Sequence, residues 1–280
     1  MDDIPAPNLS NSYSFNEKML FVHKSKINPE ILGIGSSMSL NNLDTKTIVN
    51  HFDKKKYLNT ASWGFSIKDN YLFLKALKEI YHPQMIMMAS NNIDFQQEEK
   101  KINYQEVVNY IKSENASKYY LGYDYFNLKY FFTNFKYARE VRSCNKDYQY
   151  LNFDENGGVN FESEGFNIKP GRWNEDYIRY AIQDEQYKYF DSINSFCAKN
   201  KIKFSFFQTP LRSSYAKTLN AAQNKILSDH YNKVSEIVHK YDHKFVNAND
   251  LKDWDDSLYV DVIHLNKIGS KIFTQYCLSH

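Results

Sequence analysis

The sequence predicts an α/β fold, a three-layer α/β/α sandwich around about five parallel strands in the flavodoxin-like order 2-1-3-4-5. Short apolar runs alternate along the chain with longer segments whose apolar residues recur at helical spacing. The composition agrees: 42% hydrophobic and 24% charged residues over 280 positions are typical of a globular protein. We therefore expect a single domain spanning 1–280.

Five apolar runs are the expected strands: residues 30–35, 57–61, 84–89, 202–208 and 244–247. Parallel strands need crossover connections, and helical spacing marks several of them. The expected helices are residues 69–81, 184–200 and 220–241, with a closing helix from near Leu265. Because such crossovers are right-handed, helices should cover both faces of the sheet.

Two stretches lie outside this alternation. Residues 1–29 are predicted as an irregular lead-in with a short amphipathic stretch. The third strand ends near residue 90 and the fourth begins near residue 202, a gap too long for one crossover, so we interpret 96–183 as a helical insertion. Ligands bind beyond the carboxyl ends of parallel strands, so the insertion is expected to form a wall of the cleft, with Tyr119, Tyr123 and Tyr125 on its surface.

Charge and cysteine content exclude several classes of function. The net charge of +2 and the mixed acidic and basic background predict no nucleic-acid partner. Cys144, Cys197 and Cys277 are too widely spaced for a zinc motif or a disulfide framework. The sequence contains no run of eighteen apolar residues, so no membrane span is predicted. The opening residues do not resemble a signal peptide. We expect a cytoplasmic protein, or a cell-envelope protein if an upstream anchor has been removed.

Two distant segments carry groups suited to nucleophilic catalysis. Gly33-Ile34-Gly35-Ser36-Ser37 follows the first strand, and Asp261-Val262-Ile263-His264 precedes the closing helix. A serine hydroxyl becomes nucleophilic when an imidazole takes its proton, and a carboxylate fixes the tautomer of that imidazole. Taken separately, the first segment could be a phosphate-binding turn, although no lysine completes a nucleotide motif. The second could be a helix cap.

Four segments in order resemble the SGNH/GDSL hydrolase superfamily, whose members carry Ser, Gly, Asn and His in separate blocks. Gly35-Ser36-Ser37 is similar to the first block, with Ser36 where Asp is usual, as in members that modify cell-envelope polysaccharides. The other matches are Gly64 for the second block, Ala89-Ser90-Asn91-Asn92 for the third, and Asp261 with His264 for the last.

The resemblance implies a role for each matched residue. Ser37 is the nucleophile, His264 the base and Asp261 the carboxylate that orients it. The oxyanion hole consists of the Ser37 and Gly64 backbone N–H groups and the Asn91 side chain, with Asn92 as the alternative.

The resemblance further implies acyl transfer through an acyl-Ser37 intermediate, on O-acyl groups, expected to be O-acetyl, of a cell-surface carbohydrate. The acceptor, water or a sugar hydroxyl, would make the protein an esterase or an O-acyltransferase. No metal or organic cofactor is implied. The alternative is a non-catalytic glycan-binding or assembly protein that keeps the fold.

Two further side chains are candidate substrate contacts. Arg212 follows the fourth strand and could bind an anionic substrate group at the carboxyl edge of the sheet, or could be a solvated loop residue. Trp63 could stack on a sugar face or pack in the interior.

Overall fold

The computed structural model describes residues 5–114, 128–143, 150–162, 184–250 and 254–280, with Tyr119, Trp173, Ile178 and Ile182. Five strands form one parallel sheet. They are β1 (Ile31–Ile34), β2 (Tyr57–Asn59), β3 (Met85–Ser90), β4 (Lys203–Gln208) and β5 (Lys244–Asn247). The order β2-β1-β3-β4-β5 confirms the predicted topology.

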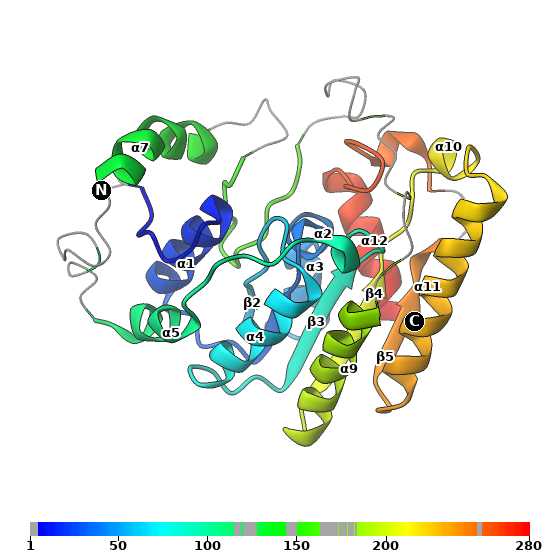
Figure 1. Ribbon diagram of the computed structural model, residues 1–280, viewed down its shortest axis with the longest axis horizontal. Coiled ribbons are helices and arrows are strands. Elements are labelled where there is room, and N and C mark those ends of the chain that lie inside the picture. Colours follow the sequence, from blue (N-terminus) through cyan, green and yellow to red (C-terminus); the bar gives the residue numbers. More distant parts are fainter. Residues whose placement is uncertain are drawn as a thin grey trace.

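Helices cover both faces of this sheet, as expected for a three-layer sandwich (Figure 1). One face packs against α1 (Tyr13–Ser25), α4 (Ile67–Lys78), α5 (Tyr104–Lys112), α9 (Asp184–Lys199) and α11 (Ala221–His239). The other packs against α3 (Thr45–His51) and α12 (Lys267–Ser279), with α2 (Ser37–Asn42) at the carboxyl edge. The remaining elements are α7 (Leu128–Ser143), α10 (Ser213–Ala216), η1 (Asp94–Gln96), η2 (Ala248–Asp250) and η3 (Asp256–Leu258).

Burial on both faces explains why the strands are apolar along their length. All four residues of β1 are buried. In β4, Phe204 and Phe206 point to one face and pack edge-on against Phe190 of α9, whereas Phe207 belongs to the core on the other face. Each strand thus contributes to two cores at once, which a continuous apolar run permits.

The structure differs from the sequence-based expectations at the shorter elements. The helices α2 and α3 were not predicted, because six and seven residues are too few to show a helical period. A side-chain cap starts α3, since the Asp44 carboxylate accepts the Thr47 N–H at 2.8 Å. The predicted lead-in is more regular than expected: α1 buries Phe15 and Met19 in the main core.

Two helices of the expected insertion, α5 and α7, contact the N-terminal helix α1. The helix α5 packs against α1 and α4, and Arg142 of α7 pairs with Glu17 of α1 at 2.8 Å. Figure 1 shows α1, α5 and α7 together at one side of the sheet. Tyr119 is buried against Tyr110, so the expectation of a surface position was wrong; Tyr123 and Tyr125 lie outside the described residues. None of the described helices is long and apolar enough to cross a membrane.

Candidate active site

The turn from β1 into α2 presents two serines at the carboxyl edge of the sheet. Gly35 has a φ of 138°, and a Cβ there would collide with the Ser39 side chain, so this turn requires glycine. The buried Ser36 caps α2, its hydroxyl accepting the Met38 N–H at 3.1 Å. Ser37 begins the helix and is only half-buried. Of the two hydroxyls, that of Ser37 is the more accessible.

Asp261 and His264 form a hydrogen-bonded pair in the loop before α12. Asp261 is fully buried, and its Oδ2 lies 2.7 Å from His264 Nδ1. Its Oδ1 accepts the backbone N–H groups of Ile263 and His264 at 2.8 and 2.7 Å. Burial opposes the charge on Asp261, but the imidazole and these hydrogen bonds outweigh it and lower the pKa of the carboxyl. The carboxylate therefore stays ionised and holds the ring from its Nδ1 side.

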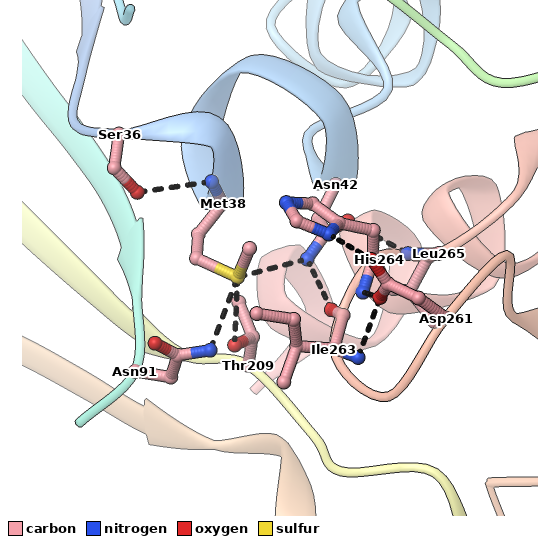
Figure 2. A network of polar contacts seen from close by, with 9 residues as sticks. All are labelled: Ser36, Met38, Asn42, Asn91, Thr209, Asp261, Ile263, His264 and Leu265. Carbon is pink, nitrogen blue, oxygen red and sulfur yellow. Dashed lines mark hydrogen bonds and ion pairs between the residues drawn. The ribbon is translucent and has the colours of Figure 1, made fainter. Parts of the chain in front are cut away.

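Asn42, at the end of α2, joins the serine helix to the histidine loop (Figure 2). Its Nδ2 donates to the Ile263 carbonyl at 3.2 Å, and its Oδ1 accepts the Leu265 N–H at 2.9 Å. The two bonds fall on the residues immediately before and after His264. The amide thus fixes the histidine relative to the helix that begins with Ser37. The sequence offered no signal for this role, because a single Asn in a polar stretch resembles any turn residue.

The two halves of the predicted triad lie on segments that Asn42 ties together. In the part of the chain that the structure describes, no hydrogen bond joins the Ser37 hydroxyl to His264. Catalytic hydrogen bonds are often long in a ligand-free site and shorten when substrate binds.

The end of β3 places two amides beside the serine turn. Asn91 Nδ2 lies 3.1 Å from the Met38 sulfur, and its Oδ1 accepts the Ile93 N–H at 3.0 Å. The Thr209 hydroxyl is also directed at this thioether, at 3.7 Å (Figure 2). Asn92 is buried, and its Nδ2 has no hydrogen-bond partner among the described residues. Both candidate oxyanion-hole amides therefore lie at the sheet edge that carries Ser37.

Gly64 lies beyond the end of the neighbouring strand β2. It adopts a φ of 64°, a left-handed conformation that favours glycine. Ser62, two residues earlier, donates its N–H to the Gly35 carbonyl at 3.1 Å, which ties this segment to the serine turn. Trp63 is half-buried and packs against the apolar cluster that contains Phe161.

Arg212 is buried and already has protein partners. Its guanidinium lies 3.8 Å above the Trp173 ring, donates to the Trp173 carbonyl at 2.6 Å, and pairs with Asp256 at 2.8 Å. It also donates to the Ser214 hydroxyl. The alternative of a solvated loop arginine is wrong. Binding of an anionic substrate group by Arg212 would have to compete with Asp256.

Residues 150–162 of the expected insertion pass close to the histidine. The Val159 N–H donates to the Leu40 carbonyl of α2 at 3.1 Å, and the Phe161 carbonyl accepts the Lys267 N–H at 2.8 Å. The Phe161 ring meets the His264 ring edge-on, with centroids 6.0 Å apart. This contact was also missed in the sequence, where Phe161 is one of 20 Phe residues.

No protein-family model and no curated protein matches the sequence. The solved structures that the chain resembles include LAE5, an alpha/beta hydrolase enzyme from the metagenome of Lake Arreo, Spain (11% identity, TM-score 0.49, 90% of this chain and 94% of that one). A GDSL-like lipase from Bacteroides thetaiotaomicron shares 10% identity (TM-score 0.46, 94% and 96% covered). A variant of Axe2, an acetyl-xylooligosaccharide esterase from Geobacillus, shares 12% (TM-score 0.45, 91% and 97%).

Proposed function

We propose that this protein is a serine-dependent acyl hydrolase or acyltransferase that works through an acyl-Ser37 intermediate. The observation that carries the proposal is the buried Asp261–His264 pair at 2.7 Å, which Asn42 ties to the helix that begins with Ser37. A carboxylate, an imidazole and a hydroxyl on adjoining segments are the parts that acyl transfer needs.

In the first half-reaction the Ser37 oxygen attacks the carbonyl carbon of an ester, and His264 takes the hydroxyl proton. The imidazolium is stabilised by the Asp261 carboxylate. The carbonyl electrons move onto its oxygen, which accepts hydrogen bonds from the Ser37 and Gly64 N–H groups and from Asn91 or Asn92. Loss of one such donor costs about 3–4 kcal/mol of transition-state stabilisation. The intermediate then expels the alcohol, which takes the proton from His264.

In the second half-reaction His264 removes a proton from the acceptor, whose oxygen attacks the acyl-Ser37 carbonyl. Collapse of this intermediate breaks the bond to the Ser37 oxygen and returns the proton to it. Water as acceptor gives a free acid, and a sugar hydroxyl gives a new ester. Both reactions use the same residues, so the proposal covers both.

The proposed substrate is an O-acetylated carbohydrate of the cell surface. The similarity of Gly35-Ser36-Ser37 to the motif of polysaccharide-modifying members of the superfamily supports this choice. Trp63, half-buried beyond β2, is the proposed sugar-stacking residue.

A non-catalytic glycan-binding protein is the second candidate. It is favoured by the two departures from the superfamily motifs, Ser36 for Asp and Ala89 for Gly. Ala89 nevertheless fits this fold, because both its N–H and its carbonyl bond to the Ser39 hydroxyl of α2, at 2.8 and 2.9 Å.

Covalent labelling distinguishes the two candidates. A fluorophosphonate probe should label the intact protein at Ser37, identified by peptide mass spectrometry. Ser37→Ala should abolish labelling, whereas Ser36→Ala should keep it. Absence of labelling, together with retained binding of acetylated glycans, would favour the binding protein. Labelling at Ser36 would show that the other serine of the pair is the nucleophile.

A further inference from the structure

The thioether of Met38 is a buried group to which the proposed mechanism assigns no role. Met38 follows Ser37 in α2 and is 1% exposed. Three polar groups are directed at its sulfur: Asn91 Nδ2 at 3.1 Å, Asn42 Nδ2 at 3.7 Å and the Thr209 hydroxyl at 3.7 Å (Figure 2). The sulfur therefore lies where the serine helix and the ends of β3 and β4 meet.

Of these three groups, the Asn91 amide depends most on the sulfur. Asn42 Nδ2 has a stronger acceptor, the Ile263 carbonyl, at 3.2 Å. The Thr209 hydroxyl lies farther from the sulfur and can rotate toward another acceptor. For Asn91 Nδ2, in contrast, the sulfur is the only hydrogen-bond partner found among the described residues. Loss of the sulfur would leave this buried N–H without an acceptor.

Both ends of the Asn91 amide have a contact that fixes their direction. Its Oδ1 accepts the Ile93 N–H at 3.0 Å, and its Nδ2 is directed at the Met38 sulfur. An amide nitrogen carries two protons, so one remains for an oxyanion formed at Ser37. A thioether is a weak acceptor, whereas hydrogen bonds to an anionic oxygen are strong. The sulfur can therefore orient the amide without competing with the oxyanion.

We infer that Met38 is a positioning residue of the proposed enzyme, whose thioether holds the Asn91 amide in the orientation in which it donates to the oxyanion. The inference rests on the proposed function, and it selects Asn91 over Asn92 as the amide of the oxyanion hole. Met38 acts through Asn91 and not on the substrate. Such positioning favours catalysis because a donor that is already oriented needs no rearrangement when charge develops.

A double-mutant cycle in kcat for an aryl acetate tests the inference. Met38→Leu nearly conserves volume but removes the acceptor, and it should lower kcat about five- to twentyfold with little change in KM. Asn91→Ala removes the donor and should lower kcat about 10²- to 10³-fold. In the Asn91→Ala background, Met38→Leu should change kcat less than about twofold, because no amide is left to position.

Met87→Leu is the matched control. Met87 is also 1% exposed, but it belongs to the core between the sheet and α12, and in the part of the chain that the structure describes no polar group is directed at its sulfur. The same chemical change should there leave kcat within about twofold of wild type. Circular dichroism checks that every variant is folded. If Met38→Leu does not fold, Met38→Ile replaces it in the cycle.

The outcomes separate the inference from the proposed function. If Ser37 is labelled and the ester is hydrolysed, but Met38→Leu lowers kcat by the same factor with and without the Asn91 amide, the sulfur serves packing alone and only the inference is overturned. Wild-type kcat in Met38→Leu or in Asn91→Ala would also overturn it, as would an equal loss in Met87→Leu. If Ser37 is not labelled and no ester is hydrolysed, the proposed function fails, and the role of Met38 fails with it.

Discussion

Two buried carboxylates bind basic side chains of different chemistry. Asp261 pairs with His264 at the carboxyl edge of the sheet, and Glu17 pairs with Arg142 between α1 and α7. Both carboxylates are almost inaccessible to solvent. Glu17 receives the guanidinium on both oxygens, at 2.8 and 2.9 Å, and Oε1 also accepts the Ala6 N–H at 3.1 Å. Asp261 instead receives two N–H groups of its own loop on one oxygen and the imidazole on the other.

The difference lies in the basic partner. A guanidinium keeps its charge at every accessible pH, so the pair with Glu17 can only anchor α7 to α1. An imidazole can accept and release a proton, so the pair with Asp261 can take part in proton transfer. Burial of charge alone thus does not identify a site. A titratable partner on a segment tied to the helix of a candidate nucleophile makes such a pair a candidate site.

The largest expected effect is on activity at the first pair. His264→Ala should lower kcat for an aryl acetate on the order of 10⁴-fold or more, because it removes the proposed acceptor of the serine proton. Asp261→Asn should lower it by roughly 10²–10⁴-fold through the wrong tautomer. Circular dichroism of both variants should show the wild-type helix content. Substantial activity in His264→Ala would contradict the triad.

The second pair should respond in stability instead. Arg142→Met leaves Glu17 buried without its cation and should lower the free energy of unfolding by about 2–3 kcal/mol, less than for a fully buried pair because Arg142 is partly exposed. Urea unfolding measures the loss. Lys225→Ala, which breaks the exposed pair with Asp229, should change it by less than about 0.5 kcal/mol. Activity per folded molecule should be unchanged in both; a large loss in Arg142→Met would couple this region to the site.

Asn42 allows a test of the Asp261–His264 pair without a change in charge, because its uncharged amide bonds to the residues before and after His264. Asn42→Ala removes both bonds that bracket His264 and should lower kcat about 10- to 100-fold. Asn41→Ala is the matched control, because Asn41 is equally buried in the same helix but bonds to Val159 at 2.9 Å. Its kcat should fall much less for a similar loss of stability. Equal losses of kcat in the two variants would mean that any destabilisation of α2 lowers activity, and that the bonds of Asn42 have no special role.

The pH dependence of stability distinguishes two buried carboxyl groups, Asp94 and Asp261. The pKa of Asp94 is raised to about 6, so its contribution to stability is full below the unfolded value near 4 and is lost as pH rises through about 6. Asp94→Asn should therefore gain on the order of 2 kcal/mol relative to wild type between about pH 4 and about pH 8. The pKa of Asp261 is lowered, so its contribution is present above about pH 4 and is lost as pH falls below it. Urea unfolding across this range should show opposite trends for Asp94→Asn and Asp261→Asn.

The sheet could be predicted from the sequence more completely than the candidate site. Strand periodicity and strand order depend on local apolar runs and on general rules of connection, so all five strands were predicted, with ends within a few residues. The pairing of Asp261 with His264 could also be predicted, because His264 is only three positions after Asp261. Asn42 could not be predicted, since its hydrogen bonds go to residues 221 and 223 positions away.

The smallest expected effect concerns substrate choice. Trp63→Ala should raise KM for an acetylated oligosaccharide several-fold while leaving an aryl acetate nearly unaffected, because only the larger substrate draws on binding contacts away from the reacting ester. Trp63→Phe keeps an aromatic ring in the apolar cluster and should restore most of the affinity. Steady-state kinetics on both substrates measures the ratio. Equal losses on the two substrates, with lower stability, would show that Trp63 stabilises the fold, as the Glu17–Arg142 pair does, and does not bind the substrate.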